Sequence, residues 1–212
     1  MPTDRSSPAL LTLHAVRLLG FADTPRVAAR YRLDTTRTAS LLEDFRAGGW
    51  VTRSEFAGTG GWSLTDSGRA EDERLLADEL SASGGRAVVA RVHASFVPLN
   101  ARFQQAVTRW QLRPVGGNAF AANDHTDFRW DDRVIASLRS VGRRLGALED
   151  DVTQVLPRFS GYAARYDAAI ARVVAGQHQW VDGVGTDSCH LVWFQLHEDL
   201  LATLGLERGA GR

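Results

Sequence analysis

Two histidines near the C-terminal end of the chain have a spacing that could serve ligand binding or chemistry. His190 and His197 lie seven residues apart in the apolar segment HLVWFQLHEDLL. Seven residues make two helical turns, so both side chains lie on one face of a helix. The pair could be core residues, metal ligands or the lining of a pocket. Their axial separation of about 10.5 Å is too large for one ion, and we expect no metal site.

Nucleophilic catalysis has little support in the sequence. Cys189 is the only cysteine, and in a helix its side chain would point about 100° away from that of its neighbour His190. No G-x-S-x-G or G-x-G-x-x-G motif occurs. All 25 basic residues are arginine. Schiff-base and P-loop chemistry, which needs lysine, is therefore excluded.

The elements that must position the two histidines are helices. Helical spacing covers residues 86–112, about 131–156, about 158–175 and 190–201. Pro98 should kink or divide the first of these helices, because its ring removes a backbone donor and clashes with the preceding turn. No strand pattern is convincing after Leu64. We therefore expect an all-helical bundle in this part of the chain.

Aromatic and polar side chains alternate on the faces of these helices that should point inward. Several His, Asn and Trp groups that converge inside a bundle are typical of a small-molecule site. We expect a pocket for a small, partly aromatic or anionic effector, lined by His93, Asn100, Trp110, His190, Trp193 and His197. The alternative is that the histidines are core residues bonded to backbone or carboxylate groups.

The first 80 residues predict a different arrangement. Helical spacing covers 8–19, a segment capped by Thr24 and a segment capped by Asp34 that ends at Gly48. WVTRSEF and WSLT then alternate on either side of a glycine-rich turn, which predicts a two-stranded hairpin. Thr65 or Asp66 caps a further helix. The order helix, helix, helix, hairpin, helix is that of a winged helix, so we expect a mainly α fold with this unit before the bundle.

Two phrases in this region, LLEDFRAGGWVTR and LTDSGR, resemble those of MarR-type winged-helix regulators. The resemblance covers roughly residues 8–80 and implies that the helix after Asp34 reads DNA. Hydroxyls and arginines suit contacts to phosphates and base edges. The expected DNA contacts are Arg26, Arg30, Arg32, Thr35, Thr36, Arg37, Thr38, Ser40 and Arg53. The hairpin tip AGTGG carries no Arg or Lys, so we expect its DNA contacts to be weak.

Charge and composition limit the class of protein. The formal net charge is zero, so any DNA contact must come from a local patch. No apolar run approaches the 18–20 or so residues of a membrane span, and the polar N-terminus does not resemble a signal peptide. A cytoplasmic protein is expected. The flexible SASGG at 81–85 suggests a boundary between a DNA-binding domain, 1–80, and a helical effector-binding and dimerisation domain, 86–212.

The sequence therefore predicts a ligand-responsive transcriptional regulator that binds double-stranded DNA as a homodimer. Two alternatives stay open. In one, the winged helix is a scaffold and the bundle is an enzyme for a small molecule, with His190 or His197 as general base. In the other, the chain is a protein-interaction module. The identity of the effector and of any cofactor does not follow from the sequence.

Overall fold

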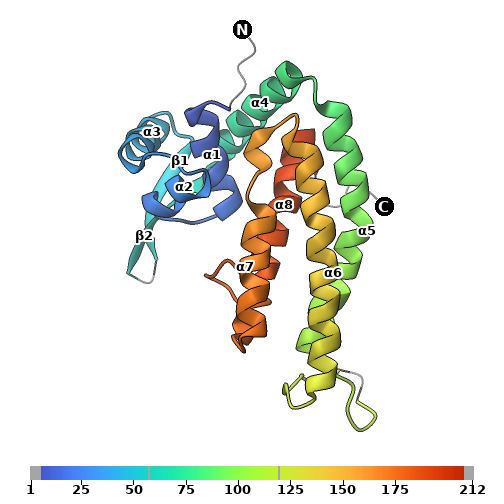
Figure 1. Cartoon of the computed structure of the whole chain (residues 1–212). Coiled ribbons are helices and arrows are strands. Elements are labelled where there is room, and N and C mark those ends of the chain that lie inside the picture. The colour runs from blue at the N-terminus through green and yellow to red at the C-terminus, as the bar shows by residue number, and fades with distance from the viewer. Residues whose placement is uncertain (1–5, 57, 119, 208–212) are drawn as a thin grey trace. The chain divides into compact units, whose positions relative to one another are not determined.

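The computed structural model describes residues 6–56, 58–118 and 120–207 (Figure 1). The chain is mainly helical, with one two-stranded antiparallel sheet. It forms two compact units. The first contains the described residues up to Val89, Val155–Arg158 and those from Glu198 onward, and the second contains Ala90–Gln154 and Phe159–His197. The expected boundary at 81–85, which would divide the chain into two independently folding domains, stays a prediction.

The first unit begins with the order of elements that the sequence predicts. These elements are α1 (Pro8–Leu19), α2 (Thr24–Arg30), α3 (Thr35–Ala47), β1 (Val51–Phe56), β2 (Thr59–Leu64) and α4 (Asp66–Ser83). Side-chain caps explain the helix starts, since each satisfies a backbone N–H that has no partner within the helix. Asp34 caps α3 and Thr65 caps α4, as expected. The cap of α2 is Asp23 rather than Thr24.

The hairpin is tied to the helices by backbone hydrogen bonds. β1 and β2 pair antiparallel with Val51 opposite Leu64. Ala22, in the turn between α1 and α2, forms an isolated bridge with Trp62 of β2. The N–H of Trp62 donates to the carbonyl of Ala22 over 2.8 Å, and the N–H of Ala22 donates back over 3.3 Å. The base of the hairpin therefore has a defined position relative to α1 and α2.

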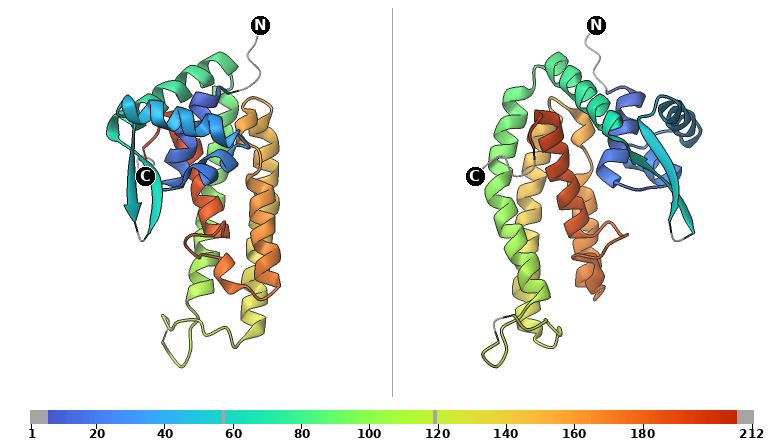
Figure 2. Two further views of the ribbon diagram at one scale, coloured as in Figure 1. Left: turned by 90° about the vertical axis from the view of Figure 1, so that its left-hand side faces the viewer. Right: turned by 180° about the vertical axis from the view of Figure 1, so that it is seen from behind.

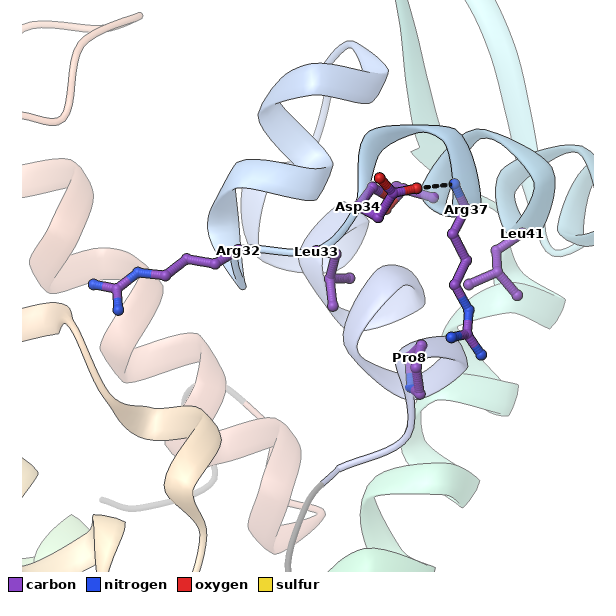
Figure 3. Close-up of a pocket in the computed structure, with 7 residues that line it drawn as sticks. Pro8, Arg32, Leu33, Asp34, Arg37 and Leu41 are labelled. Atoms are coloured by element: carbon purple, nitrogen blue, oxygen red, sulfur yellow. Dashed lines mark hydrogen bonds between the residues drawn. The ribbon is translucent and has the colours of Figure 1, made fainter.

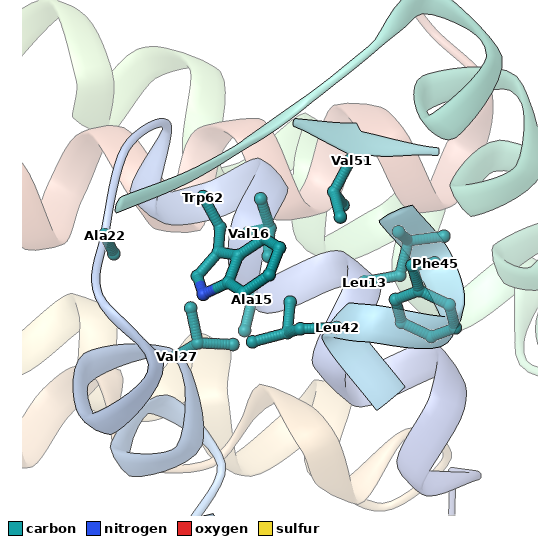
Figure 4. Packing of buried hydrophobic residues seen from close by; sticks show 9 residues of the cluster. All are labelled: Leu13, Ala15, Val16, Ala22, Val27, Leu42, Phe45, Val51 and Trp62. Carbon is teal, nitrogen blue, oxygen red and sulfur yellow. The ribbon is translucent and has the colours of Figure 1, made fainter. Parts of the chain in front are cut away.

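One hydrophobic cluster holds the first three helices and the hairpin together. Its buried members are Leu13, Ala15, Val16, Ala22, Val27, Leu42, Phe45, Val51 and Trp62 (Figure 4). The indole of Trp62 is buried, and its Nε1–H donates to Thr24 Oγ1 over 3.0 Å. Burial of this apolar surface is the main favourable term for the unit. The shared cluster therefore holds α3 and the hairpin against each other.

The second unit is helical, as predicted. Its helices are α5 (Arg86–Gln111), α6 (Phe128–Thr153), α7 (Tyr162–Val174) and α8 (Cys189–Leu204), with short 3-10 turns η1 (Pro157–Phe159) and η2 (His178–Trp180). The first residues of α5 and the last of α8 belong to the first unit. α6 and α7 lie side by side (Figure 2), and Tyr166 of α7 donates its hydroxyl to the carbonyl of Leu138 over 3.1 Å.

Pro98 does not divide α5, which corrects part of the expectation. The helix continues through it as one element. Phe96 and Leu99 on either side are buried, whereas Pro98 itself is exposed. Packing of the flanking residues thus offsets the loss of one backbone hydrogen bond. Within residues 6–56, 58–118 and 120–207, every helix is too short or too polar to cross a membrane.

Candidate nucleic-acid interface

The N-terminal turn of α3 presents hydroxyls and an arginine to solvent. Thr35, Thr36, Arg37 and Ser40 are all exposed. The helix begins here because Asp34 Oδ1 accepts from the backbone N–H of Arg37 over 2.8 Å. Side chains of this kind at a helix N-terminus can bind phosphate and base edges. The side chains of these four expected contacts are therefore accessible to solvent.

Thr38 is placed differently from the sequence expectation. Its side chain is buried, and its hydroxyl donates to the carbonyl of Asp34 over 2.8 Å. Because this side chain is buried, its hydroxyl cannot reach a base edge. Thr38 is thus a structural residue of α3, and we remove it from the expected DNA contacts.

The arginines of α2 and of the turn that follows it divide into two groups. Arg26 and Arg32 are exposed, and Arg32 has a left-handed backbone with φ of 54°. Arg30 instead turns inward: its guanidinium lies over the ring of Tyr31, and only 3% of its side chain is exposed. Its Nη2 lies 4.0 Å from Asp199 Oδ2. The expectation that Arg30 flanks a DNA backbone is therefore wrong, because an acidic partner far along the chain draws it into the interior.

Arg53 lies on β1 and is exposed, as its expected role requires. Its guanidinium carbon lies 5.5 Å from the centre of the Trp62 ring. Contact of a cation with an aromatic face limits the conformations of the long side chain. Arg53 therefore offers a positive charge at the hairpin that is held close to the unit's core.

A small pocket adjoins the start of α3 (Figure 3). Its volume is about 200 Å³, and its lining is Pro8, Arg32, Leu33, Asp34, Arg37, Thr38 and Leu41. Figure 3 shows Arg37 extending toward Pro8 and Arg32 extending away from it. Drug-sized ligands occupy about 300–1,000 Å³. This depression is thus smaller than a typical site for a drug-sized ligand.

The first unit also contains a cluster of buried charged side chains that the sequence did not predict. His14 of α1 is fully buried between two carboxylates. Its Nδ1 lies 3.2 Å from both oxygens of Asp72, and its Nε2 lies 3.1 Å from Asp199 Oδ1. Arg158 donates to Asp199 through Nη1. We call His14, Asp72, Arg158 and Asp199 the buried charge cluster.

The protonation state of His14 follows from this geometry. A neutral imidazole has one N–H, whereas two carboxylates on opposite nitrogens require two donors. Burial alone would lower the pKa of His14, but Asp72 and Asp199 together raise that pKa above its ordinary value. The histidine is therefore an imidazolium. Burial likewise opposes the charge on Asp199, yet Arg158 and His14 hold the pKa of Asp199 below its usual range.

Further groups complete the balance of charge around the cluster. Arg17 donates to Asp72 over 3.2 Å and to Glu198 over 3.0 Å. Arg158 donates through Nε to Glu79 over 2.7 Å and through Nη2 to Thr203 over 2.6 Å. Opposite charges are thus paired and hydrogen-bonded, which is the condition under which ions persist in a protein interior. In the sequence, this cluster was indicated only by charged residues that interrupt the apolar stripes of the helices.

In the second unit, five of the six residues expected in the effector pocket gather around two phenylalanines. His93, Phe96, Asn100 and Phe103 come from α5, and His190, Trp193 and His197 come from α8; we call these seven the ring cluster. Trp193 stacks on Phe96 and Phe103 with ring centres 4.7 and 4.8 Å apart. Its Nε1–H donates to Asn100 Oδ1 over 2.9 Å.

The histidines of the ring cluster differ in exposure. His190 is exposed and lies parallel to Phe103, with ring centres 6.2 Å apart. His93 and His197 are half-buried and stack at 6.3 Å. Burial lowers the pKa of His93, which favours its neutral form. Because the described rings pack against one another, the core explanation of the histidines and the pocket explanation both remain compatible with this geometry.

Trp110, the sixth expected pocket residue, lies in a different group. It is buried and contacts His125 and His178, with ring centres 4.5 and 5.3 Å apart. The sequence suggested no role for this pair of histidines. Their only signal was their position in two loops rich in turn-forming residues.

Cys189 is not a candidate nucleophile. It is buried at the start of α8. Burial raises the pKa of its thiol to about 12, so the reactive thiolate is absent near neutral pH. Among the residues described, no three His, Cys, Asp or Glu side chains are arranged to hold a metal ion.

Comparison with known proteins gives no relative from which a function could be transferred. No family model, curated protein or solved structure matches the chain. Any functional assignment must therefore be argued from the residues and their geometry.

Proposed function

We propose that this chain is a ligand-responsive transcriptional regulator whose first unit binds double-stranded DNA as a MarR-type winged helix. The observation that carries the proposal is the joint placement of α3 and the hairpin. Exposed Thr35, Thr36, Arg37 and Ser40 begin a helix that shares one hydrophobic cluster with a hairpin bearing exposed Arg53. A rigid helix that presents these groups suits the major groove, and the hairpin arginine suits the adjacent phosphates.

Electrostatics support a local rather than a general DNA interface. The chain has no net charge, so binding cannot depend on overall attraction. Arg26, Arg32, Arg37 and Arg53 are the exposed arginines of the proposed surface. Four phosphate or base contacts per protomer are few, and a homodimer on two half-sites would double them. The proposal therefore includes a homodimer.

The test of DNA binding is selection of bound sequences from a random pool of duplexes by the full chain, followed by fluorescence anisotropy on the enriched sequence. We expect a dissociation constant of about 10⁻⁸–10⁻¹¹ M. Arg37→Ala should weaken specific binding by about 1–3 kcal/mol if Arg37 contacts a base through two hydrogen bonds.

Arg74→Ala is the matched control for that substitution. Arg74 is an exposed arginine of the same unit that pairs with Glu71 and Asp78 on α4, outside the proposed surface. Its removal should leave DNA affinity unchanged. A pool that yields no enriched sequence, or equal losses in the two variants, would contradict DNA recognition by α3.

The ring cluster is the proposed effector site. It combines the buried, stacked rings of Phe96, Phe103 and Trp193 with the polar side chains of His93, Asn100 and His197, which are only partly buried. Small-molecule sites usually have such a lining, in which a few polar groups orient an apolar ligand.

Native mass spectrometry of the purified chain should detect a co-purifying molecule of low mass. His197→Ala should abolish the thermal stabilisation that this molecule gives, while DNA binding by the free protein stays near wild type.

A further inference from the structure

His125 has the environment of a functional histidine, although it lies outside both sites described so far. It lies in the loop before α6, and its backbone is left-handed, with φ of 58°. A non-glycine residue in this region costs free energy, so the surroundings must hold it there. Its N–H donates to Asn123 Oδ1 over 3.2 Å, and its Nδ1 lies 3.0 Å from Asp131 Oδ2.

Asp131 determines how the His125 ring is protonated. The carboxylate is nearly buried, with 10% of its side chain exposed, and its other oxygen accepts from Asn123 Nδ2 over 2.9 Å. Asn123 Nδ2 also lies 3.2 Å from His125 Nδ1, but the carboxylate can only accept, so Nδ1 carries a proton directed at Asp131. In the neutral ring Nε2 then keeps its lone pair.

A second imidazole lies beside the ring of His125. The ring centres of His125 and His178 are 4.5 Å apart, with an angle of 56° between their planes. The indole of Trp110 contacts both rings from the protein side. His178 is exposed, and 24% of the His125 side chain is exposed, so solvent reaches the pair. Within the residues described, neither His125 Nε2 nor a ring nitrogen of His178 has a hydrogen-bond partner.

We propose that His125 and His178 bind a divalent transition-metal ion of the Zn²⁺ or Ni²⁺ class. Neutral imidazole nitrogen is a preferred ligand of these ions. Two Zn–N bonds of about 2.0–2.1 Å at a tetrahedral angle place the nitrogens about 3.4 Å apart. The ring centres of the two histidines are 4.5 Å apart, and ion binding would require the exposed His178 side chain to turn a ring nitrogen toward the ion.

Asp131 supports this assignment as a positioning residue. Histidine ligands of metals nearly always donate their other ring N–H to a carboxylate or carbonyl, which sets the tautomer and makes the ligand more basic. The pair of Asp131 and His125 has this arrangement already, without the ion. Because no third His, Cys, Asp or Glu completes the set among the described residues, solvent would occupy the remaining positions. The ion would therefore be exchangeable.

The test is isothermal titration calorimetry of the full chain with Zn²⁺ and with Ni²⁺ at pH 7.5, with Mg²⁺ as the hard-cation control. We expect one site for each of the first two ions and none for Mg²⁺. His178→Ala and His125→Ala should each remove the site, and Asp131→Asn should lower affinity about 10–100-fold.

Gln179→Ala is the matched control, because Gln179 is an exposed residue next to His178 that belongs neither to this pair nor to the ring cluster. It should bind both ions as the wild type does. Circular dichroism without metal checks that each variant is folded, and His178→Ala carries the test if His125→Ala does not fold. Unchanged binding in His178→Ala, or an equal loss in Gln179→Ala, would overturn the proposal. The outcome is independent of DNA binding.

Discussion

The Nε2 atom of His14 lies 3.1 Å from Oδ1 of Asp199, although the two residues are 185 positions apart in the chain. Both side chains are fully buried. The contact joins α1 to the C-terminal part of α8 within the first unit. The unit proposed to bind DNA thus includes the end of a helix whose earlier part, His190 to His197, contains three of the seven members of the ring cluster.

Replacement of His14 should destabilise the protein strongly. His14→Ala removes the positive charge between Asp72 and Asp199 and leaves a cavity beside two buried carboxylates. Breaking one partner of a buried ion pair costs about 3–5 kcal/mol. The free energy of unfolding from urea titration measures this loss. His190→Ala, at an exposed histidine, should stay within about 0.5 kcal/mol of wild type.

The same cluster predicts how stability depends on pH. The pKa of His14 is raised above 6.5 in the folded protein. Its stabilising contribution is therefore complete below that value and is lost as pH rises through the folded pKa. The groups that face it are Asp72 and Asp199, with Arg17 and Arg158 behind them. Urea titrations from pH 6 to 9 should show falling stability in the wild type.

His14→Gln provides the reference for this pH series, because glutamine does not titrate. Its stability should be lower at pH 6 and should vary less between pH 6 and 9 than that of the wild type. On the acid side, the lowered pKa of Asp199 has the opposite sign: its contribution is present above 3.8 and is lost as pH falls through its folded pKa. A wild type whose stability rises from pH 6 to 9 would rule out a charged His14.

Asn100 should stabilise the ring cluster through Trp193. The indole N–H of Trp193 donates to Asn100 Oδ1 over 2.9 Å, and the indole is buried. Asn100→Ala leaves this donor without its partner, which costs about 1–3 kcal/mol of unfolding free energy. Gln104→Ala, at an exposed position of the same helix, should cost less than about 0.5 kcal/mol. Equal stability of the two variants would show that the hydrogen bond contributes nothing.

Arg53 should contribute to DNA affinity through its charge and not through recognition of bases. We expect Arg53→Ala to lower affinity by a similar factor for enriched and random duplexes. The slope of log affinity against log salt should fall in magnitude by about 1, since one phosphate contact is lost. Anisotropy titrations from 50 to 200 mM salt measure this slope. A loss confined to the enriched duplex would instead identify Arg53 as a base-reading residue.

Two glycines should respond to alanine in opposite directions. A Cβ on Gly68, in the first turn of α4, would collide with the backbone carbonyl of Trp50 at the base of the hairpin. Gly68→Ala should therefore cost at least about 1–3 kcal/mol. Gly146 lies inside α6, and its Cβ would meet open space. Gly146→Ala should stabilise the protein by about 0.8–1 kcal/mol, and thermal unfolding of both variants checks the pair.

The sequence alone determined the local elements of this protein. Asp34 and Thr65 identified helix starts, and alternation on either side of a glycine-rich turn identified the hairpin. Such signals are readable because a cap or a turn is made by residues within a few positions of each other. The cap of α2 was predicted one residue too late, since Asp23 rather than Thr24 caps this helix.

Only the tertiary structure decided which side chains meet. Arg30 and Thr38 have the residue types of DNA contacts, yet one turns toward Asp199 and the other bonds its own helix start. Trp110 joins His125 rather than the ring cluster. Periodicity shows which face of a helix is apolar, but not which helix packs against it. Contacts across 185 residues depend on that packing, and so the imidazolium of His14 could not be read from the chain.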